Sequence, residues 1–435
     1  MAAGGRRSKD PIVIVGAGLA GLSAALRLGR GYRLVEARAV PGGLAETVVD
    51  EGYRFDRTGH LLHLRDPRAR RLVQGLLGEE LIGIDRRARI FSFGVHTPYP
   101  FQANTHGLPP AVAAECLTGF IEAWSRRGGE RARAADFERF ILANFGPGIA
   151  RHFMIPYNRK LWGVHPREIG DEWCERFVPV PNLGEVVAGA VGLPQERIGY
   201  NASFFYPRRG IGELPAAMAA RAGTIEWRTR PRAIDFRRHR IDLHGQWVPY
   251  RALIATAPLD ALVALLADPP ARIRRAAGLL RCQALRYLDV ALTRPAGNDH
   301  HWTYVPDPRL PFYRVGAYSN FSKEMAPRGR GSLYVELASR APVRMDRLRD
   351  PLVDGLRAMG LIRRAGDIAF VRPRLIPRAY VLYDAGRREA EVEILPWLEE
   401  QGIFAAGRYA RWEYAVMEDA LIQGIEVANR ARALA

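Results

Sequence analysis

The sequence predicts an α/β fold in which a parallel-sheet unit is interleaved with a helical region and an antiparallel sheet. A β-branched run at 11–15 leads into a glycine-rich turn, a helical stretch and a second strand ending near residue 36, which together form a βαβ unit. Residues 108–152 carry apolar residues at three- and four-residue spacing, and short strands dominate from 224 onward. These are the periods of amphipathic helices and of strands, respectively.

The chain of 435 residues contains no flexible linker, repeat or low-complexity tract. Its length is that of about three domains, so we expect the domains to be interleaved rather than consecutive. The predicted Rossmann-like, dinucleotide-binding domain is discontinuous and comprises 1–88, 200–270 and 395–435. A helical domain with mobile active-site loops is predicted at 106–195. A sheet-rich substrate domain is predicted at 89–105 and 271–394.

Composition excludes several function classes. The net charge of +18 comes almost entirely from arginine, since lysine occurs only at Lys9, Lys160 and Lys323. The arginines are scattered and follow no nucleic-acid-binding motif, so we expect a solvated basic surface with a few arginines reserved for an anionic ligand. Outside 11–26 no window of 18 uncharged apolar residues occurs, so no membrane span is predicted.

Cysteine usage indicates a reducing compartment. Cys116, Cys174 and Cys282 are odd in number and form no CxxC pair, so neither a disulfide framework nor a metal site is expected. The Arg6-Arg7 pair superficially resembles a twin-arginine export signal. The apolar residues after it are better accounted for by the first strand and the glycine turn, and we expect a cytoplasmic protein.

A glycine motif of the form GxGxxG joins the first strand to the first helix, at Gly16, Gly18 and Gly21. Glycines there let the chain turn tightly and let a helix N-terminus approach a pyrophosphate. Glu36, at the end of the second strand, is placed to accept hydrogen bonds from a ribose. The Gly-Gly pair at 42–43 favours FAD over NAD, because this extension is typical of glutathione-reductase-type and amine-oxidase-type flavoproteins.

The C-terminal region supports the same cofactor. In those flavoproteins a late apolar strand ends in glycine, and a final helix directs its N-terminus at the flavin pyrimidine. Residues 402–407 read GIFAAG, and a helix is predicted from about Glu418 to Arg430. A helix N-terminus beside the pyrimidine favours the anionic reduced flavin.

An arginine interrupts the predicted strand at 311–320. Alternation places Tyr313, Val315 and Ala317 on one face. The other face is predicted to hold Phe312, Arg314, Gly316 and Tyr318. A charge among apolar neighbours is costly unless an anion pairs it, so Arg314 is expected to meet either an anionic ligand or, as the alternative, a surface ion-pair partner at a strand edge.

Five stretches resemble the UDP-galactopyranose mutases, especially the eukaryotic-type branch: TPYPFQAN at 97–104, PYNRKLWG at 156–163, GYNASFFYP at 199–207, PFYRVGAYSN at 311–320 and GRYARWEY at 407–414. The resemblance covers residues 12–430. It implies an FAD domain, a helical domain and a twisted antiparallel sheet. It also implies the interconversion of UDP-galactopyranose and UDP-galactofuranose.

The resemblance implies roles for particular residues. The catalytic set is Arg314 and Arg408 on the substrate diphosphate, His60 beside the isoalloxazine, and Arg176 at the mobile loop. Phosphate-side tyrosines are Tyr304, Tyr383 and Tyr414, of which Tyr383 is the loosest match. The uracil is held by Tyr99, Phe101 and Gln102, and the loop and sugar pocket also contain Asn158, Trp162 and Asn201. Cofactor contacts are Gly16, Gly18, Gly21, Glu36, Gly42, Gly43, Leu44, Gly407 and Met417.

The chemistry that the resemblance implies uses the cofactor as the nucleophile. N5 of reduced FAD attacks the anomeric carbon, UDP leaves, and the resulting flavin–sugar adduct opens and recloses as a furanose. Consistent with this, the sequence shows no Ser-His-Asp triad, metal cluster or obvious pair of catalytic carboxylates. A reductant such as NAD(P)H would keep the flavin reduced. The sequence leaves the oligomeric state open.

Three positions depart from the family pattern. Thr58-Gly59-His60 stands where the family commonly has Gly-Gly-His, and His63 replaces an aromatic residue of the eukaryotic-type branch. Met417-Glu418-Asp419 replaces a more amide-rich stretch.

Three alternative functions therefore stay open: a mutase of another nucleotide sugar, an FAD-dependent amine or protoporphyrinogen-type oxidase, and a binding protein with a structural flavin.

Overall fold

The computed structural model describes residues 10–193, 198, 202–338 and 342–434. A five-stranded parallel sheet combines strands from three distant parts of the chain, in the order β19-β13-β1-β2-β9. Their bounds are β1 Ile12–Val15, β2 Tyr32–Val35, β9 Ile225–Glu226, β13 Ala252–Ala255 and β19 Ile403–Ala405. Because the chain returns to this sheet twice, the predicted α/β architecture with interleaved units is confirmed.

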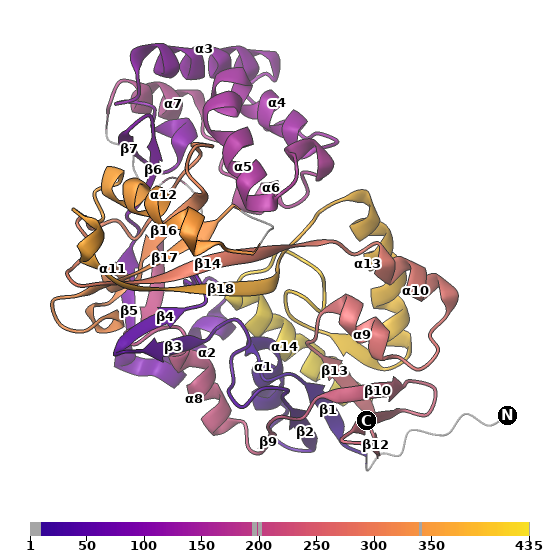
Figure 1. Ribbon diagram of the computed structural model, residues 1–435. Helices are drawn as coiled ribbons and strands as arrows, with labels where there is room; N and C mark the ends of the chain where they lie inside the picture. Colours follow the sequence, from indigo (N-terminus) through magenta and orange to yellow (C-terminus); the bar gives the residue numbers. More distant parts are fainter. Residues whose placement is uncertain (1–9, 194–197, 199–201, 339–341, 435) are drawn as a thin grey trace.

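A seven-stranded sheet forms the centre of the molecule, in the order β18-β14-β17-β16-β15-β6-β7. Its strand pairs are antiparallel except β15 with β6. The bounds are β6 Ala88–Ser92, β7 Val95–Pro98, β14 Cys282–Leu292, β15 Trp302–Tyr304, β16 Phe312–Ala317, β17 Gly331–Leu337 and β18 Ile368–Val381. Figure 1 shows this sheet between the parallel sheet and a group of helices that includes α3, α4 and α7.

Smaller elements complete the fold. A three-stranded sheet and two ribbons comprise β10 Pro231–Asp235, β11 Arg240–Leu243, β12 Gln246–Pro249, β3 Thr47–Asp50, β4 Tyr53–Asp56, β5 Leu81–Asp85 and β8 Ser203–Pro207. The predicted hairpin at His244-Gly245 joins β11 to β12. Both residues have positive φ, as a two-residue hairpin turn demands.

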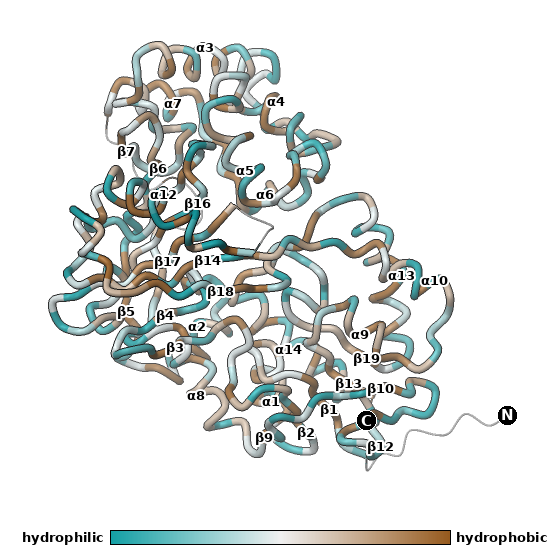
Figure 2. The backbone as a smooth tube through the Cα atoms, viewed as in Figure 1, coloured by the Kyte–Doolittle hydropathy of each residue, from teal (hydrophilic) through white to brown (hydrophobic). Residues whose placement is uncertain are grey.

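The described helices follow. They are α1 Leu19–Leu28, α2 Pro67–Leu77, α3 Pro110–Arg126, α4 Phe137–Ile149, α5 Ile155–Trp162, α6 Cys174–Phe177, α7 Leu183–Ala190, α8 Glu213–Arg221, α9 Leu259–Leu265, α10 Ala271–Gly278, α11 Tyr318–Phe321, α12 Met345–Ala358, α13 Ala385–Glu400 and α14 Met417–Ala433. Hydrophobic and hydrophilic residues alternate along turns such as those of α3 and α4 (Figure 2), as amphipathic packing requires. Within the described part of the chain, no helix is long and apolar enough to cross a membrane. The domain limits predicted from the sequence stay a proposal.

Strand β16 departs from the predicted alternation, because a bulge interrupts it. Phe312 pairs with Leu337 and Arg314 with Glu336, so Tyr313 is an extra residue between them. A bulge reverses which face the following side chains occupy. Phe312 therefore packs in one core cluster with Val315 and Ala317, whereas Tyr313 lies in another.

The bulge corrects the prediction about the two faces of the strand. Phe312 does not share a face with Arg314. Tyr318 is not part of the strand, because it begins helix α11. The register instead places Arg314 directly across from a glutamate of β17, which alternation within 311–320 could not indicate.

Gly316 faces Tyr334, its partner on β17. A Cβ at position 316 would overlap the fully buried ring of Tyr334, and one at Gly59 would approach the hydroxyl of the same tyrosine to 2.5 Å. The two glycines therefore hold the ring between β16 and the loop that carries His60.

We expect Gly316→Ala to lower the free energy of unfolding by about 1–3 kcal/mol, because the Tyr334 ring has to leave its packed position. The measurement is urea unfolding of the FAD-loaded protein. Gly278→Ala is the matched control, since no atom lies within 4 Å of its added Cβ. Equal stability of the two variants would contradict this account of Gly316.

Candidate active site

The turn between β1 and α1 is shaped to receive a dinucleotide. Gly16 has φ +103°, and a Cβ there would overlap the hydroxyl of Thr256. A Cβ at Gly21 would overlap the carbonyl oxygen of Gly16. No side chain caps α1 at Gly18, so the helix N-terminus can face a pyrophosphate.

The second half of this cradle comes from the loop after β2. Glu36 is nine-tenths buried, and its carboxylate accepts the backbone N–H of Ala17 and of Arg38, each at 2.8 Å. Gly42 has φ +109° and donates its N–H to the Ala17 carbonyl at 2.8 Å. Gly43 also has positive φ, and Leu44 packs against the core. The predicted glycines and Glu36 thus lie together around one turn and fit an FAD.

The predicted C-terminal cofactor residues flank one loop. Gly407, with φ +90°, follows β19 and donates its N–H to the side-chain oxygen of Gln423 at 2.8 Å. Met417 is the first residue of α14, which packs along α1. The loop between them carries Arg408 and Tyr414.

Arg314 is held by a buried ion pair. Its Nε and Nη2 donate to the two carboxylate oxygens of Glu336 at 2.8 and 2.6 Å, and Nη2 lies 3.4 Å from the Tyr380 hydroxyl. The Glu336 side chain is fully buried and that of Arg314 is 21% exposed. Burial by itself lowers the pKa of Arg314, but Glu336 and neighbouring tyrosines raise it well above the usual value. A two-point fork of this kind fixes the guanidinium plane.

Arg408 is held by backbone carbonyls and not, in the described part of the chain, by an ion pair. Its Nη1 and Nη2 donate to the carbonyls of Ala415 and Ala379, each at 2.9 Å, and its buried Nε has no hydrogen-bond partner. Its Cζ lies 4.6 Å from the Tyr414 ring centroid and 5.6 Å from that of Tyr380. Among the described residues no carboxylate forms an ion pair with it. Within the described residues its charge is therefore not neutralised by a carboxylate.

Tyr380 of β18 lies between the two guanidinium groups. Arg314 approaches its hydroxyl and Arg408 approaches its ring. The sequence-based prediction of phosphate-side tyrosines includes Tyr383 and does not include Tyr380. The structure shows the Tyr383 hydroxyl accepting the backbone N–H of Tyr414 at 2.8 Å. The two tyrosines are three residues apart, and only the packing of β18 decides which one meets the arginines.

His60 lies near the same pair of charges, and its buried Nδ1 has no hydrogen-bond partner. Burial lowers its pKa to about 4, and the positive charges of Arg408 and Arg314 contribute in the same direction. His63, the unusual residue three positions later, has Nδ1 3.2 Å from the Ser203 carbonyl. Burial lowers the pKa of His63 to about 4 as well, although its contact with Ser203 acts in the opposite direction, so both histidines are neutral near neutral pH.

Several predicted substrate residues form an aromatic wall. Tyr304 packs against Tyr99, with ring centroids 5.2 Å apart, and edge-on against Tyr157 at 5.3 Å. Trp162 is fully buried, with its ring 5.8 Å from that of Tyr380 and 5.9 Å from that of Tyr414. Tyr157 was not singled out from the sequence, although it belongs to the PYNRKLWG stretch.

Three predicted substrate residues make contacts within the protein. Phe101 is fully buried and stacks on Phe153 at 4.9 Å. The side-chain amide of Gln102 donates to Pro179, and that of Asn158 donates to Met154, each at 2.7 Å. Asn201 lies outside the described residues. The assignment of these positions to a uracil and sugar pocket stays a prediction.

Lys160 fastens α5 to the segment before β16. Its partly buried ammonium donates to three carbonyls, those of Val305 at 3.2 Å, Asp307 at 2.5 Å and Phe312 at 2.9 Å. Burial lowers its pKa to about 8. The lysine thereby couples the helix that carries Trp162 to the strand that carries Arg314.

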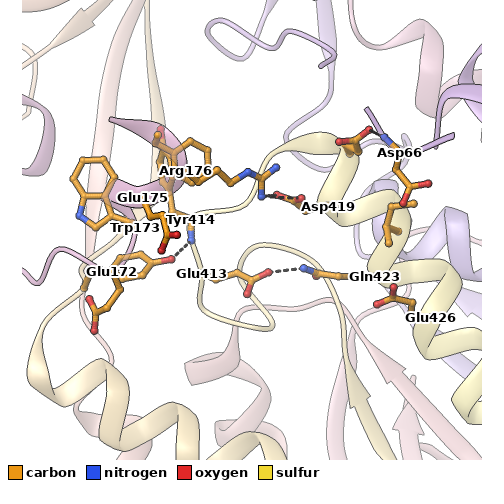
Figure 3. Close-up of a pocket in the computed structure, with 14 residues that line it drawn as sticks. Asp66, Glu172, Trp173, Glu175, Arg176, Glu413, Tyr414, Asp419, Gln423 and Glu426 are labelled. Atoms are coloured by element: carbon orange, nitrogen blue, oxygen red, sulfur yellow. Dashed lines mark hydrogen bonds and ion pairs between the residues drawn. The ribbon is translucent and has the colours of Figure 1, made fainter. Parts of the chain in front are cut away.

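Arg176 is one of the residues that line a pocket of about 730 Å³ (Figure 3). Its Nη1 lies 3.0 and 2.9 Å from the two oxygens of Asp419, and its Cζ lies 5.1 Å from the Phe177 ring centroid. Tyr383 and Tyr414 line this pocket as well. The described carboxylates lining it are Asp66, Glu172, Glu175, Glu413, Glu418, Asp419 and Glu426.

The chain belongs to the flavin-containing amine oxidoreductase family, whose model matches residues 19–432. It is similar to a solved structure of reduced UDP-galactopyranose mutase, with 27% identity and a TM-score of 0.91, covering 98% of this chain and 94% of that one. It is therefore an FAD-dependent member of this family, and the predicted cofactor and fold class are confirmed.

Other similar proteins carry the names of different enzymes. A putative protoporphyrinogen oxidase from Exiguobacterium sp. 255-15 shares the fold, with 16% identity and a TM-score of 0.76, covering 98% of this chain and 99% of that one. A phytoene dehydrogenase from Streptomyces griseus is 26% identical over 355 residues, which are 74% of this chain and 66% of the relative. The chain thus spans about two thirds of the length of that curated relative.

We expect Glu336→Ala to lower the free energy of unfolding by about 3–5 kcal/mol, because it leaves the buried charge of Arg314 unpaired. Denaturant unfolding measures the change. The control is Glu226→Ala, since Glu226 forms a similar fork with Arg33 but both side chains are about one-third exposed. That pair is worth about 1 kcal/mol or less. A loss at Glu336 no larger than at Glu226 would show that the pairing does not hold Arg314.

We expect the imidazole of His60 to stay neutral down to about pH 5, because its pKa is lowered to about 4. A group whose folded-state pKa lies below its unfolded value stabilises the fold above the unfolded pKa, and this contribution is lost as the pH falls through 6.5 toward 4. Histidine NMR signals followed from pH 8 to 5, assigned by comparison with His60→Gln, measure the titration. A midpoint near 6.5 would refute the predicted environment.

Proposed function

We propose that this protein is an FAD-dependent mutase that interconverts UDP-galactopyranose and UDP-galactofuranose without net redox change. One observation carries the proposal. Arg314 and Arg408, far apart in the sequence, both lie beside Tyr380, Arg314 at its hydroxyl and Arg408 at its ring, and the charges of both act on His60. The overall similarity to reduced UDP-galactopyranose mutase supports this reading of the site.

The two arginines would bind the substrate diphosphate. Arg408 brings a charge that no described carboxylate neutralises, and Arg314 offers a guanidinium whose orientation Glu336 sets. When bound, reduced FAD supplies an electron-rich nitrogen that can take up an anomeric carbon. As the bond to the sugar breaks, negative charge grows on the departing UDP, and fixed guanidinium groups stabilise that charge without reorganising.

The aromatic wall and the neutral histidine would serve the same reaction. The charge of Arg314 acts on Tyr157 and Tyr304, and Tyr99 packs on Tyr304. Such aromatic surfaces help to exclude water that would intercept the sugar. His60, being uncharged, would not compete with the arginines for the phosphates. The proposal includes a reductant such as NAD(P)H, because the flavin acts in its reduced form.

We expect Arg314→Ala and Arg408→Ala each to lower turnover of UDP-galactopyranose by at least about 100-fold, as removal of a fixed charge-stabilising donor does. FAD content stays unchanged in Arg314→Ala, because β16 lies apart from the glycine cradle. The assay follows furanose formation by chromatography with dithionite-reduced enzyme. Arg309→Ala is the control, since this arginine is 83% exposed and five residues before Arg314. Furanose formation by the Arg314→Ala variant at the unaltered rate would reject the assignment.

The acidic pocket favours a second candidate, an FAD-dependent amine oxidase. Seven carboxylates and four aromatic rings line it, and Arg176 is the one basic residue among its described lining residues. Such a lining attracts a cation through ion pairs and ring faces. Peroxide release on addition of a diamine, without furanose formation from UDP-galactopyranose, would favour the oxidase over the mutase.

A mutase of another nucleotide sugar stays the remaining alternative. Asp419 holds Arg176 at the position where the family has a more amide-rich stretch, so the sugar can differ while the diphosphate clamp is kept. Competition between UDP and GDP for the reduced enzyme separates the nucleotides, and a panel of UDP-sugars separates the sugars.

A further inference from the structure

Arg387, in the first turn of α13, is a buried cation that the proposed reaction does not use. Its side chain is 9% exposed. Burying a charge is costly, and the N-terminal end of a helix disfavours a positive charge. The contacts of its guanidinium show what offsets these costs.

The guanidinium contacts three groups at once. Its Nε donates to the Trp412 carbonyl at 2.9 Å, and its Nη2 lies 2.9 Å from a carboxylate oxygen of Glu391. Its Cζ lies 4.0 Å from the centroid of the Tyr383 ring. Arg387 therefore joins α13 to the segment 407–416 by a hydrogen bond and joins it to Tyr383 by a cation–π contact.

The segment 407–416 depends on these contacts for its shape. Trp412 is fully buried with φ +54°, a left-handed conformation that is unfavourable for a bulky residue. The Tyr414 N–H donates to the hydroxyl of Tyr383, and Arg408 in turn donates to the Ala415 carbonyl. Arg387 thus fixes the segment at Trp412 directly and at Tyr414 through Tyr383.

We propose that Arg387 is a positioning residue, which holds the segment 407–416 so that Arg408 and Tyr414 are preorganised for the diphosphate of the substrate. The inference rests on the proposed function, because it assigns the phosphate contact to Arg408. Preorganisation of this kind lowers the cost of ordering a binding loop.

The test uses the FAD-loaded enzyme in reduced form with UDP as the probe. In Arg387→Met the UDP dissociation constant rises about 10-fold to 100-fold, as expected when one charge-assisted hydrogen bond is lost. In Arg387→Lys binding is partly restored, because a single ammonium replaces the cation but not the fork. Arg272→Met is the control. Arg272 of α10 also pairs with a glutamate of α13, Glu393, at 2.8 Å, but its side chain is 53% exposed.

Hydrogen exchange of the same proteins gives a readout that does not depend on the ligand. We expect faster exchange confined to 407–416 in Arg387→Met, and no change there in Arg272→Met. Should Arg387→Met not fold, Tyr383→Phe keeps the cation and removes the acceptor of the Tyr414 N–H. It is then expected to show the same local change and weaker UDP binding.

The outcomes separate the two proposals. If the unmodified enzyme binds no UDP, the proposed function fails, and exchange at 407–416 still decides whether Arg387 orders that segment. If the unmodified enzyme binds UDP while Arg387→Met, or Tyr383→Phe in its place, binds it equally well, the inference is overturned and the proposed function stands.

Discussion

The site depends on the register of β16 against β17, which places Arg314 opposite Glu336. Without the bulge at Tyr313 the arginine would face a different partner, and its charge would lie in the protein without a counter-ion. With it, a carboxylate that is fully buried holds the guanidinium in one plane. Gly316 and Gly59 support this arrangement because they leave room for the Tyr334 ring beside the pair. The bulge in β16 and the two glycines thus allow the central sheet to accommodate the buried Arg314–Glu336 pair.

The two arginines contribute in different ways because their surroundings differ. Arg314 is oriented by an ion pair and is nearly neutralised by it. Arg408 is oriented by two carbonyls, which accept hydrogen bonds without cancelling its charge. In the proposed site, Arg314 would therefore bind the diphosphate with a fixed orientation, and Arg408 would supply the positive charge that attracts it. Two arginines that were both paired with carboxylates would attract an anion weakly. Two buried arginines without any carboxylate partner would lower the stability of the fold, because both charges would be desolvated without compensation.

Arg408 lies beside a pocket rich in carboxylates, because Tyr414 both contacts Arg408 through its ring and lines the pocket. Most of these carboxylates are engaged by arginines or backbone N–H groups, as Glu172, Glu418 and Asp419 illustrate. The pocket can therefore be less negative than its composition indicates. The arginine pair and the carboxylate-rich pocket thus give the mutase and the oxidase proposals different structural bases.

Local sequence determined the features that depend on chain neighbours. The glycine turn, Glu36 and the hairpin at His244-Gly245 follow from backbone conformations that few other residues adopt. The five family-like stretches led to Arg314 and Arg408. The partners of those arginines could not be predicted in this way. Glu336, Ala379 and Tyr380 come from other strands, and a one-residue bulge decides which side chains meet. Only tertiary structure sets such pairings, because register and packing between distant segments are properties of the folded sheet and not of any one strand.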